Sequence, residues 1–222
     1  MKKLISLIIM FALLCSLISC DDKNREYDED EVRIAAENLI RKSSDLNYIF
    51  WGEGIGYIKD DSFSVGYYYP ADIASLASFK IETIDDLKEK TREVFSSSYS
   101  ENIFSTVLSS LSDGDEIYRL ARYYQKFSDA GNKEPECIMV YSNALVLLKD
   151  EVTYNFDTLA VRGSEKETIY VTISVNVTRE EKTQIRELKV GLVEEDDGWR
   201  IDTPTYMSYI ENEDYEDLQD KK

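Results

Sequence analysis

The stretch Val171-Thr172-Ile173-Ser174-Val175-Asn176-Val177-Thr178 alternates strictly between apolar and polar side chains. Successive side chains of a β-strand point to opposite faces, so this alternation predicts a strand with one buried face. Valine and isoleucine also favour strands, because their branched side chains pack well on a pleated surface. The sequence around this stretch is therefore expected to form a sheet.

Further strand-like segments lie on both sides of this stretch. They are Cys137 to Leu148, Val152 to Val161, Ile185 to Val193 and Trp199 to Thr203. Gly163 with Ser164 is expected to form the first hairpin connection, and Asp197 with Gly198 a later turn. Four or five antiparallel strands are therefore predicted in the second half of the chain.

The first half of the chain shows the three- and four-residue apolar spacing of helices. This spacing runs from Glu31 to Phe50. Thr83, with Asp86 three residues later, predicts the start of a second helix, and Ser100 opens a third. Helices followed by strands predict an α+β fold in which N-terminal helices pack on one face of a curved antiparallel sheet.

Three glycines follow the first predicted helix, in Trp51-Gly52-Glu53-Gly54-Ile55-Gly56-Tyr57. Glycines at this spacing occur in phosphate-binding loops, but here a helix precedes them where a strand should stand, and no Lys-Ser or Lys-Thr pair follows. We therefore interpret the segment as a flexible turn lined by aromatic side chains.

The amino terminus has the layout of a secretory signal peptide. Met1-Lys2-Lys3 precedes a mainly apolar run from Leu4 to Ile18, which is too short to span a bilayer. The run ends in Leu17-Ile18-Ser19-Cys20, which resembles the lipobox of bacterial lipoproteins. This resemblance implies cleavage before Cys20 and acylation of that cysteine, so that lipid chains such as palmitate hold the protein on a bilayer.

The expected localisation is therefore extracytoplasmic and membrane-anchored. Acidic residues directly after the cysteine resemble retention signals in some bacteria and surface-export signals in others, so the inner, outer or plasma membrane stays open. We predict a signal peptide over residues 1–19, an acidic tether over 20–30, a single α+β domain over 31–206 and an acidic tail over 207–222.

Composition excludes several classes of function. The chain has 222 residues, with 44 acidic and 26 basic side chains, no histidine, and a formal net charge of −18 at pH 7. The missing histidine removes Ser-His-Asp and Cys-His catalysis and every histidine-containing metal site. The negative charge disfavours nucleic-acid binding. The sequence predicts no cofactor and no metal site.

Cysteine usage limits redox chemistry. Cys15 belongs to the predicted signal peptide and Cys20 is the predicted lipid attachment site, so Cys137 is the remaining cysteine and no internal disulfide is expected. We expect Cys137 to be a buried structural thiol, because it lies in a strand-like apolar run.

The last predicted strand is entered through Glu195-Asp196-Asp197-Gly198-Trp199-Arg200-Ile201-Asp202. This stretch, after helices and long strands, is similar to the nuclear transport factor two-like (cystatin-like cone) superfamily. The resemblance implies a cone-shaped architecture, in which Trp199 fills the wide end of the core or lines a ligand pocket. Tyr154 and Phe156 are further ligand-pocket candidates. Enzymes of that superfamily commonly use a pocket histidine, so the histidine-free sequence favours its non-catalytic members.

Several functions are compatible with these observations. The first is a lipid-anchored, non-catalytic binding or accessory module of the cell envelope, whose partners are the bilayer, through acylated Cys20, and an envelope protein or small ligand. The second is a carboxylate-based hydrolase of the envelope, which requires two acidic groups facing one another. Likeness to secreted inhibitors of cell-wall peptidases adds a third, and a divalent-cation buffer a fourth.

Overall fold

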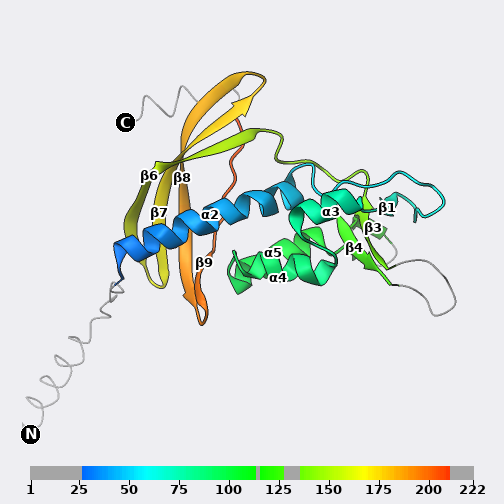
Figure 1. Ribbon diagram of the computed structural model, residues 1–222, viewed down its shortest axis with the longest axis horizontal. Coiled ribbons are helices and arrows are strands. Elements are labelled where there is room, and N and C mark those ends of the chain that lie inside the picture. Colours follow the sequence, from blue (N-terminus) through cyan, green and yellow to red (C-terminus); the bar gives the residue numbers. More distant parts are fainter. Residues whose placement is uncertain (1–26, 114–115, 128–135, 211–222) are drawn as a thin grey trace, which may run out of the picture.

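The computed structural model describes residues 27–113, 116–127 and 136–210. Within these ranges the fold is α+β, as predicted, with four helices and two main antiparallel sheets (Figure 1). The predicted signal peptide, Cys20, and the residues beyond 210 lie outside the described residues. No helix within the described ranges is long and apolar enough to cross a membrane.

The larger sheet is a meander of four antiparallel strands in the order β6-β7-β8-β9. The strands are β6 Glu151–Glu165, β7 Thr168–Arg179, β8 Lys182–Glu195 and β9 Gly198–Ile201. The alternation in β7 has the predicted effect, because its apolar positions face the core. The side chains of Val171, Ile173, Val175 and Val177 are buried.

Gly163 is not the hairpin connection that the sequence predicted. It lies inside β6 at a break in register with β7, with a φ of 124° that a side-chain-bearing residue rarely adopts. The turn follows at Lys166 and Glu167, and Lys166 itself has a positive φ. The strand therefore runs past the glycine, which serves as a bulge.

The second sheet was not predicted as a separate unit. It has the order β1-β5-β4, from β1 Tyr68–Pro70, β4 Tyr123–Lys126 and β5 Cys137–Tyr141. The prediction of one strand from Cys137 to Leu148 is wrong in its second half, because the chain turns after Tyr141. The amides of Leu147 and Leu148 donate instead to the Trp51 carbonyl, at 2.8 and 2.7 Å. The strands β2 Leu111–Asp113 and β3 Glu116–Arg119 form a separate two-stranded hairpin.

Helix α2, Glu29–Trp51, confirms the first predicted helix and starts two residues before Glu31, the predicted start of the domain. The Asp28 carboxylate caps it by accepting hydrogen bonds from the amides of Asp30 and Glu31. Tyr27, also in the predicted tether, packs against the core. The helix contacts both edge strands of the larger sheet, β6 and β9, and so crosses one face of that sheet (Figure 1).

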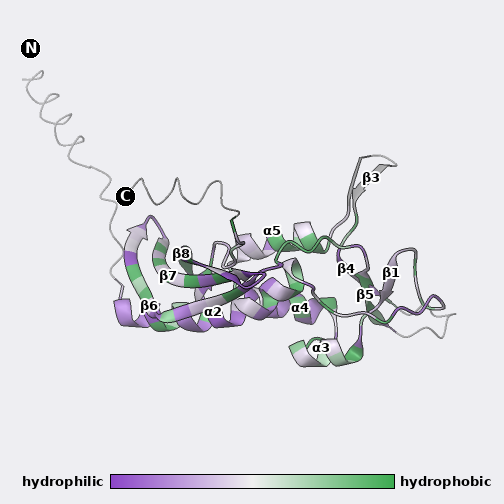
Figure 2. Cartoon of the chain, turned by 90° about the horizontal axis from the view of Figure 1, so that it is seen from above, coloured by the Kyte–Doolittle hydropathy of each residue, from purple (hydrophilic) through white to green (hydrophobic). Residues whose placement is uncertain are grey.

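Helix α4, Ile84–Arg92, has the predicted capping box between Thr83 and Asp86. Helix α5, Ser97–Val107, begins three residues before the predicted Ser100, because Ser96 is its cap. The sequence did not predict helix α3, Ile73–Phe79. In the hydropathy view, Figure 2, the apolar residues of α3 stand out beside the smaller sheet. One cluster of buried apolar side chains includes residues of α2, α4, α5 and both sheets.

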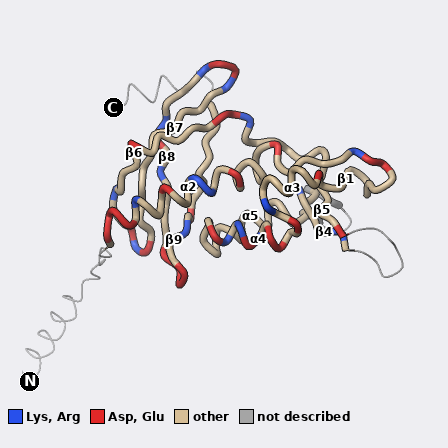
Figure 3. The backbone as a smooth tube through the Cα atoms, in the orientation of Figure 1, with Lys and Arg blue, Asp and Glu red and all other residues tan. Residues whose placement is uncertain are grey.

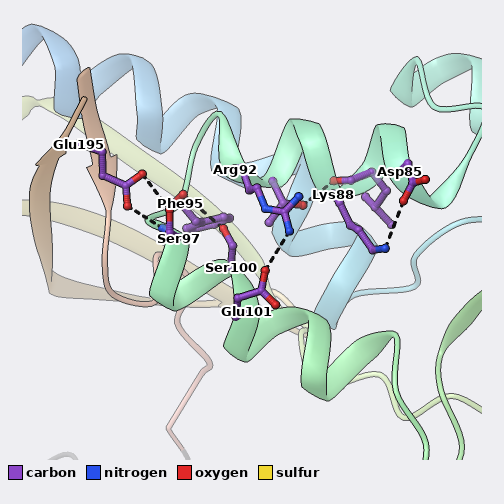
Figure 4. A network of polar contacts seen from close by, with 10 residues as sticks. Asp85, Lys88, Arg92, Phe95, Ser97, Ser100, Glu101 and Glu195 are labelled. Atoms are coloured by element: carbon purple, nitrogen blue, oxygen red, sulfur yellow. Dashed lines mark hydrogen bonds and ion pairs between the residues drawn. The ribbon is translucent and has the colours of Figure 1, made fainter. Parts of the chain in front are cut away.

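The β8–β9 hairpin is tied to the first turn of α5. The Ser97 amide donates to a Glu195 carboxylate oxygen at 2.7 Å (Figure 4). The hydroxyls of Ser96 and Ser98 donate to the Asp202 carboxylate. Negative groups at a helix amino terminus are stabilised by the helix dipole. The acidic residues around Gly198 therefore have a structural role.

The chain after β9 is held by side chains. The Tyr154 hydroxyl donates to the Thr205 carbonyl at 2.7 Å. The Gln184 side-chain amide donates to the Ile210 carbonyl at 2.7 Å and accepts from the Ile210 amide at 3.1 Å. Asp150 accepts from Arg179 and from the Tyr209 amide. Residues 207–210, assigned from sequence to the tail, are therefore attached to the sheet.

Candidate functional site

An open apolar cleft of about 850 Å³ lies beside the smaller sheet. Its walls are the segment before β1, helix α3 and the adjoining ends of β4 and β5. The apolar side chains that line it are Ile58, Phe63, Pro70, Ala71, Ile73, Leu76, Ala77, Cys137 and Ile138, with Ile81 at the end of α3. A cleft of this size and character is typical of small-molecule sites.

Helix α3 gives the cleft its apolar wall. Asp72 caps its start through the Ala74 amide, and Lys80 ends it in the left-handed conformation with a φ of 54°. Five of its seven residues, Ile-Ala-Ser-Leu-Ala-Ser-Phe, are apolar, yet none of the seven is fully buried. Ile73 is 76 % exposed. A short apolar helix left open to solvent is the feature that most clearly marks this surface.

The opposite wall is the segment from Gly56 to Pro70, and main-chain contacts fix it against α3. The Asp72 amide donates to the Gly56 carbonyl at 2.8 Å, and the Gly56 amide donates to Ser75 Oγ at 2.9 Å. The Ile58 amide donates to the Pro70 carbonyl at 2.9 Å. The cleft is therefore formed by the folded chain itself and needs no ligand to hold its walls apart.

Cys137 belongs to the cleft wall, which corrects its predicted place in the core. Its side chain is only partly buried, and its Sγ lies 3.6 Å from Met139 Sδ. The strand prediction for this residue is confirmed, but Cys137 is the first residue of β5 and borders the cleft. The thiol is therefore a natural chemical reporter for anything that occupies the space.

Charged residues surround the cleft. The lining includes two cationic side chains, Lys80 and Lys126, and three acidic ones, Asp60, Glu82 and Glu136. Hydrogen bonds from the side chain and amide of Ser62 lower the pKa of Asp60. The Gln125 side chain donates to Glu136 at 3.3 Å. A ligand with an apolar body and a polar end would meet both kinds of surface here.

The predicted pocket residues fall at two other places. Tyr154 and Phe156 border a groove between α2 and β6, of about 680 Å³. Burial raises the pKa of Tyr154 to about 12. Trp199 lies on β9, opposite Glu194, and packs half-buried against the core. The structure therefore separates Trp199 from Tyr154 and Phe156, and it places none of them in the apolar cleft.

The glycine-rich segment is closely packed. The Ile55 amide donates to the Tyr123 hydroxyl at 3.1 Å, and the Gly52 amide donates to helix carbonyls of α2. The Arg122 guanidinium donates to the Gly52 carbonyl at 2.6 Å. Because these amides already have partners, they do not form a phosphate cradle.

Three described carboxyl groups are poorly suited to act as general acids. Hydrogen bonds to the carboxylate lower the pKa of Asp60 and Asp86, and at Asp150 they outweigh the opposite effect of burial and lower the pKa. A carboxylate general acid needs a raised pKa. Among the described residues, no three or more acidic or cysteine side chains converge as a metal site would require.

Sequence reasoning missed the cleft because it missed α3. The available signal was Asp72 as a helix cap before an apolar stretch ending in Phe79. Comparison with protein-family models and with curated proteins gives no match to this chain.

Proposed function

We propose that this protein is a bacterial lipoprotein, anchored outside the cytoplasm through acylated Cys20, whose folded part is a non-catalytic module that binds an apolar small ligand. The observation that carries this proposal is the preformed cleft of about 850 Å³, with the exposed apolar face of α3 as one wall. Burying such a face yields about 25 cal/mol for each Å² of apolar surface removed from water. The ligand we propose is a long-chain amphiphile, such as a fatty acid.

The position of the cleft supports the proposal of a ligand-binding module that is anchored through its amino terminus. Helix α2 has 23 residues, so it is about 34 Å long. Its first turn is the end closer in sequence to the predicted lipid attachment site. Its last turn leads into the segment that borders the cleft (Figure 1). The helix would act as a spacer that presents the cleft away from the anchoring bilayer.

The cone-shaped, cystatin-like architecture belongs to the same proposal. Its support is the sheet of long antiparallel strands, β6 to β8, crossed on one face by α2. The smaller sheet and α3 are then additions to the cone, and the cleft lies in these additions.

Titration of palmitate by calorimetry tests the binding site. The protein for this test begins at Asp21, so that it keeps every described residue and lacks the lipid. Ile73→Glu places a charge on the exposed wall of the cleft, and it should abolish binding without unfolding the protein. Ile34→Glu is the matched control, because Ile34 is 56 % exposed on α2. Equal loss of binding in both variants, or no binding by the parent, would contradict the proposal.

The lipid anchor needs its own test in bacterial cells. Cys20→Ser should abolish incorporation of labelled palmitate and release the protein from membranes. Label that still enters the Cys20→Ser protein would contradict the lipoprotein assignment but not the cleft.

A further inference from the structure

The groove between α2 and β6 follows the edge of a strand. Six consecutive residues of β6, Val152 to Asp157, border it, and Arg41, Ser44 and Asp45 of α2 form the other side. Neighbouring residues of a strand point to opposite faces, so six in a row can border one hollow only along the strand's edge. A second hollow of about 430 Å³ shares Ser44, Val152 and Tyr154 and extends the groove along the helix.

The two edges of the larger sheet differ. At one edge, residues 94–96 cover β9, because the Ser96 amide donates to the Ile201 carbonyl at 2.8 Å and the Ile201 amide donates to the Val94 carbonyl at 2.9 Å. At the other edge, β6 pairs with β7 alone among the described residues. An open edge offers main-chain donors and acceptors to an added strand.

The base of this groove is rigid and aromatic. The Tyr154 hydroxyl is held by the Thr205 carbonyl, and the Arg41 guanidinium lies 3.8 Å from the centre of the Phe156 ring. Glu37 also binds Arg41, at 2.8 Å. The site therefore does not have to order these side chains when a partner binds.

The charge of the groove is negative. Asp45, Asp157, Glu53 and Glu151 line its two hollows, against Lys149 and the already paired Arg41. Asp150 is neutralised by Arg179. Acidic residues also recur at the hairpin ends of the same sheet (Figure 3), among them Glu180 and Glu181. This field attracts basic partners and repels acidic ones.

We propose that the groove between α2 and β6 binds an extended basic peptide segment of a protein partner, which pairs with β6 as a fifth strand of the sheet. Main-chain hydrogen bonds to the edge hold the segment, and its lysine or arginine side chains face Asp45 and Asp157. This partner site is separate from the apolar cleft and does not depend on it.

Fluorescence anisotropy with the full chain in detergent tests the proposal. The probe is a labelled Lys-Val-Lys-Val-Lys-Val peptide, compared with Glu-Val-Glu-Val-Glu-Val at physiological salt. The basic peptide should bind at least about tenfold more tightly than the acidic one. N-methylation of alternate peptide amides should weaken binding by a similar factor, because it removes donors to the strand edge. Equal affinity of the methylated and parent peptides would overturn strand addition.

Charge reversal locates the site. Asp45→Lys and Asp157→Lys should each weaken binding of the basic peptide several-fold, because both carboxylates border the groove. Glu167→Lys is the matched control, since Glu167 is an exposed acid in the β6–β7 turn. If Glu167→Lys weakens binding as much, or if the parent chain binds neither peptide, the groove is not the site and the proposal is wrong.

Discussion

The Arg122 guanidinium donates a hydrogen bond to the Gly52 carbonyl at 2.6 Å, and so clamps the end of helix α2. The same guanidinium donates to the carbonyls of Phe50 and Leu145, at 3.3 and 3.2 Å. A cation at a helix carboxyl terminus is stabilised by the unpaired carbonyls there. This clamp fixes the glycine-rich turn, from which the chain enters the wall of the apolar cleft.

Gly54→Ala should destabilise the protein strongly. Gly54 has a φ of 82°, and an added Cβ would overlap the Tyr123 hydroxyl and lie 2.6 Å from Arg122 Nη2. Gly66→Ala is the control, because its φ is 60° and no atom lies within 4 Å of the added Cβ. Urea unfolding should give a cost of about 1 kcal/mol for Gly66→Ala and at least about 2 kcal/mol more for Gly54→Ala. Equal costs would show that the turn is not clamped.

Asp150→Asn should lower stability at neutral pH and lose this effect in acid. Burial raises the pKa of Asp150, but hydrogen bonds from Arg179 and the Tyr209 amide outweigh burial, so the net pKa lies below 3.8. A lowered folded-state pKa stabilises the protein above the ordinary pKa, and this stabilisation disappears as pH falls through the folded-state value. At pH 7 the substitution should cost about 1.5 to 3 kcal/mol.

The measurement for Asp150 is the difference in unfolding free energy between the two proteins as a function of pH. It should be largest near neutral pH and shrink below the ordinary pKa of 3.8. A difference that stays constant into acid would mean that the ionised carboxylate does not hold the chain after β9.

Trp199→Ala distinguishes the two roles considered for this residue. Trp199 packs half-buried against the core and does not line the apolar cleft. Its removal should therefore cost about 3 kcal/mol in urea unfolding, and protein that is still folded should bind palmitate with unchanged affinity. A stable variant that no longer binds palmitate would show that the binding site is at Trp199.

Local signals explain which parts of the fold were predictable. The alternation in β7, the spacing in α2 and the Thr83–Asp86 capping box each depend on residues close in sequence, and each is confirmed. Helix α3 was not predicted because its seven residues are too few for an apolar spacing to repeat. The smaller sheet was not predicted because its short strands pair with strands far away in the sequence, as Tyr68 pairs with Tyr141.

The candidate site was less predictable for the same reason. Its walls come from Ile58, Leu76 and Cys137, which no local pattern links. Tyr154 and Phe156, aromatic residues of a predicted strand, were predicted to line a ligand pocket. In the structure they border a groove at a sheet edge. The position of that groove follows from the path of α2 across the sheet, which sequence spacing does not determine.

Alkylation of Cys137 tests the central claim, that the apolar cleft holds a ligand, most directly. In the chain that begins at Asp21, Cys137 is the only cysteine, and it lies in the cleft wall. The rate of its reaction with a small maleimide, followed by mass spectrometry, should fall about tenfold or more when palmitate saturates the protein. Ile73→Glu should abolish this protection, whereas Ile34→Glu should keep it. An unchanged rate at saturating palmitate would contradict the account.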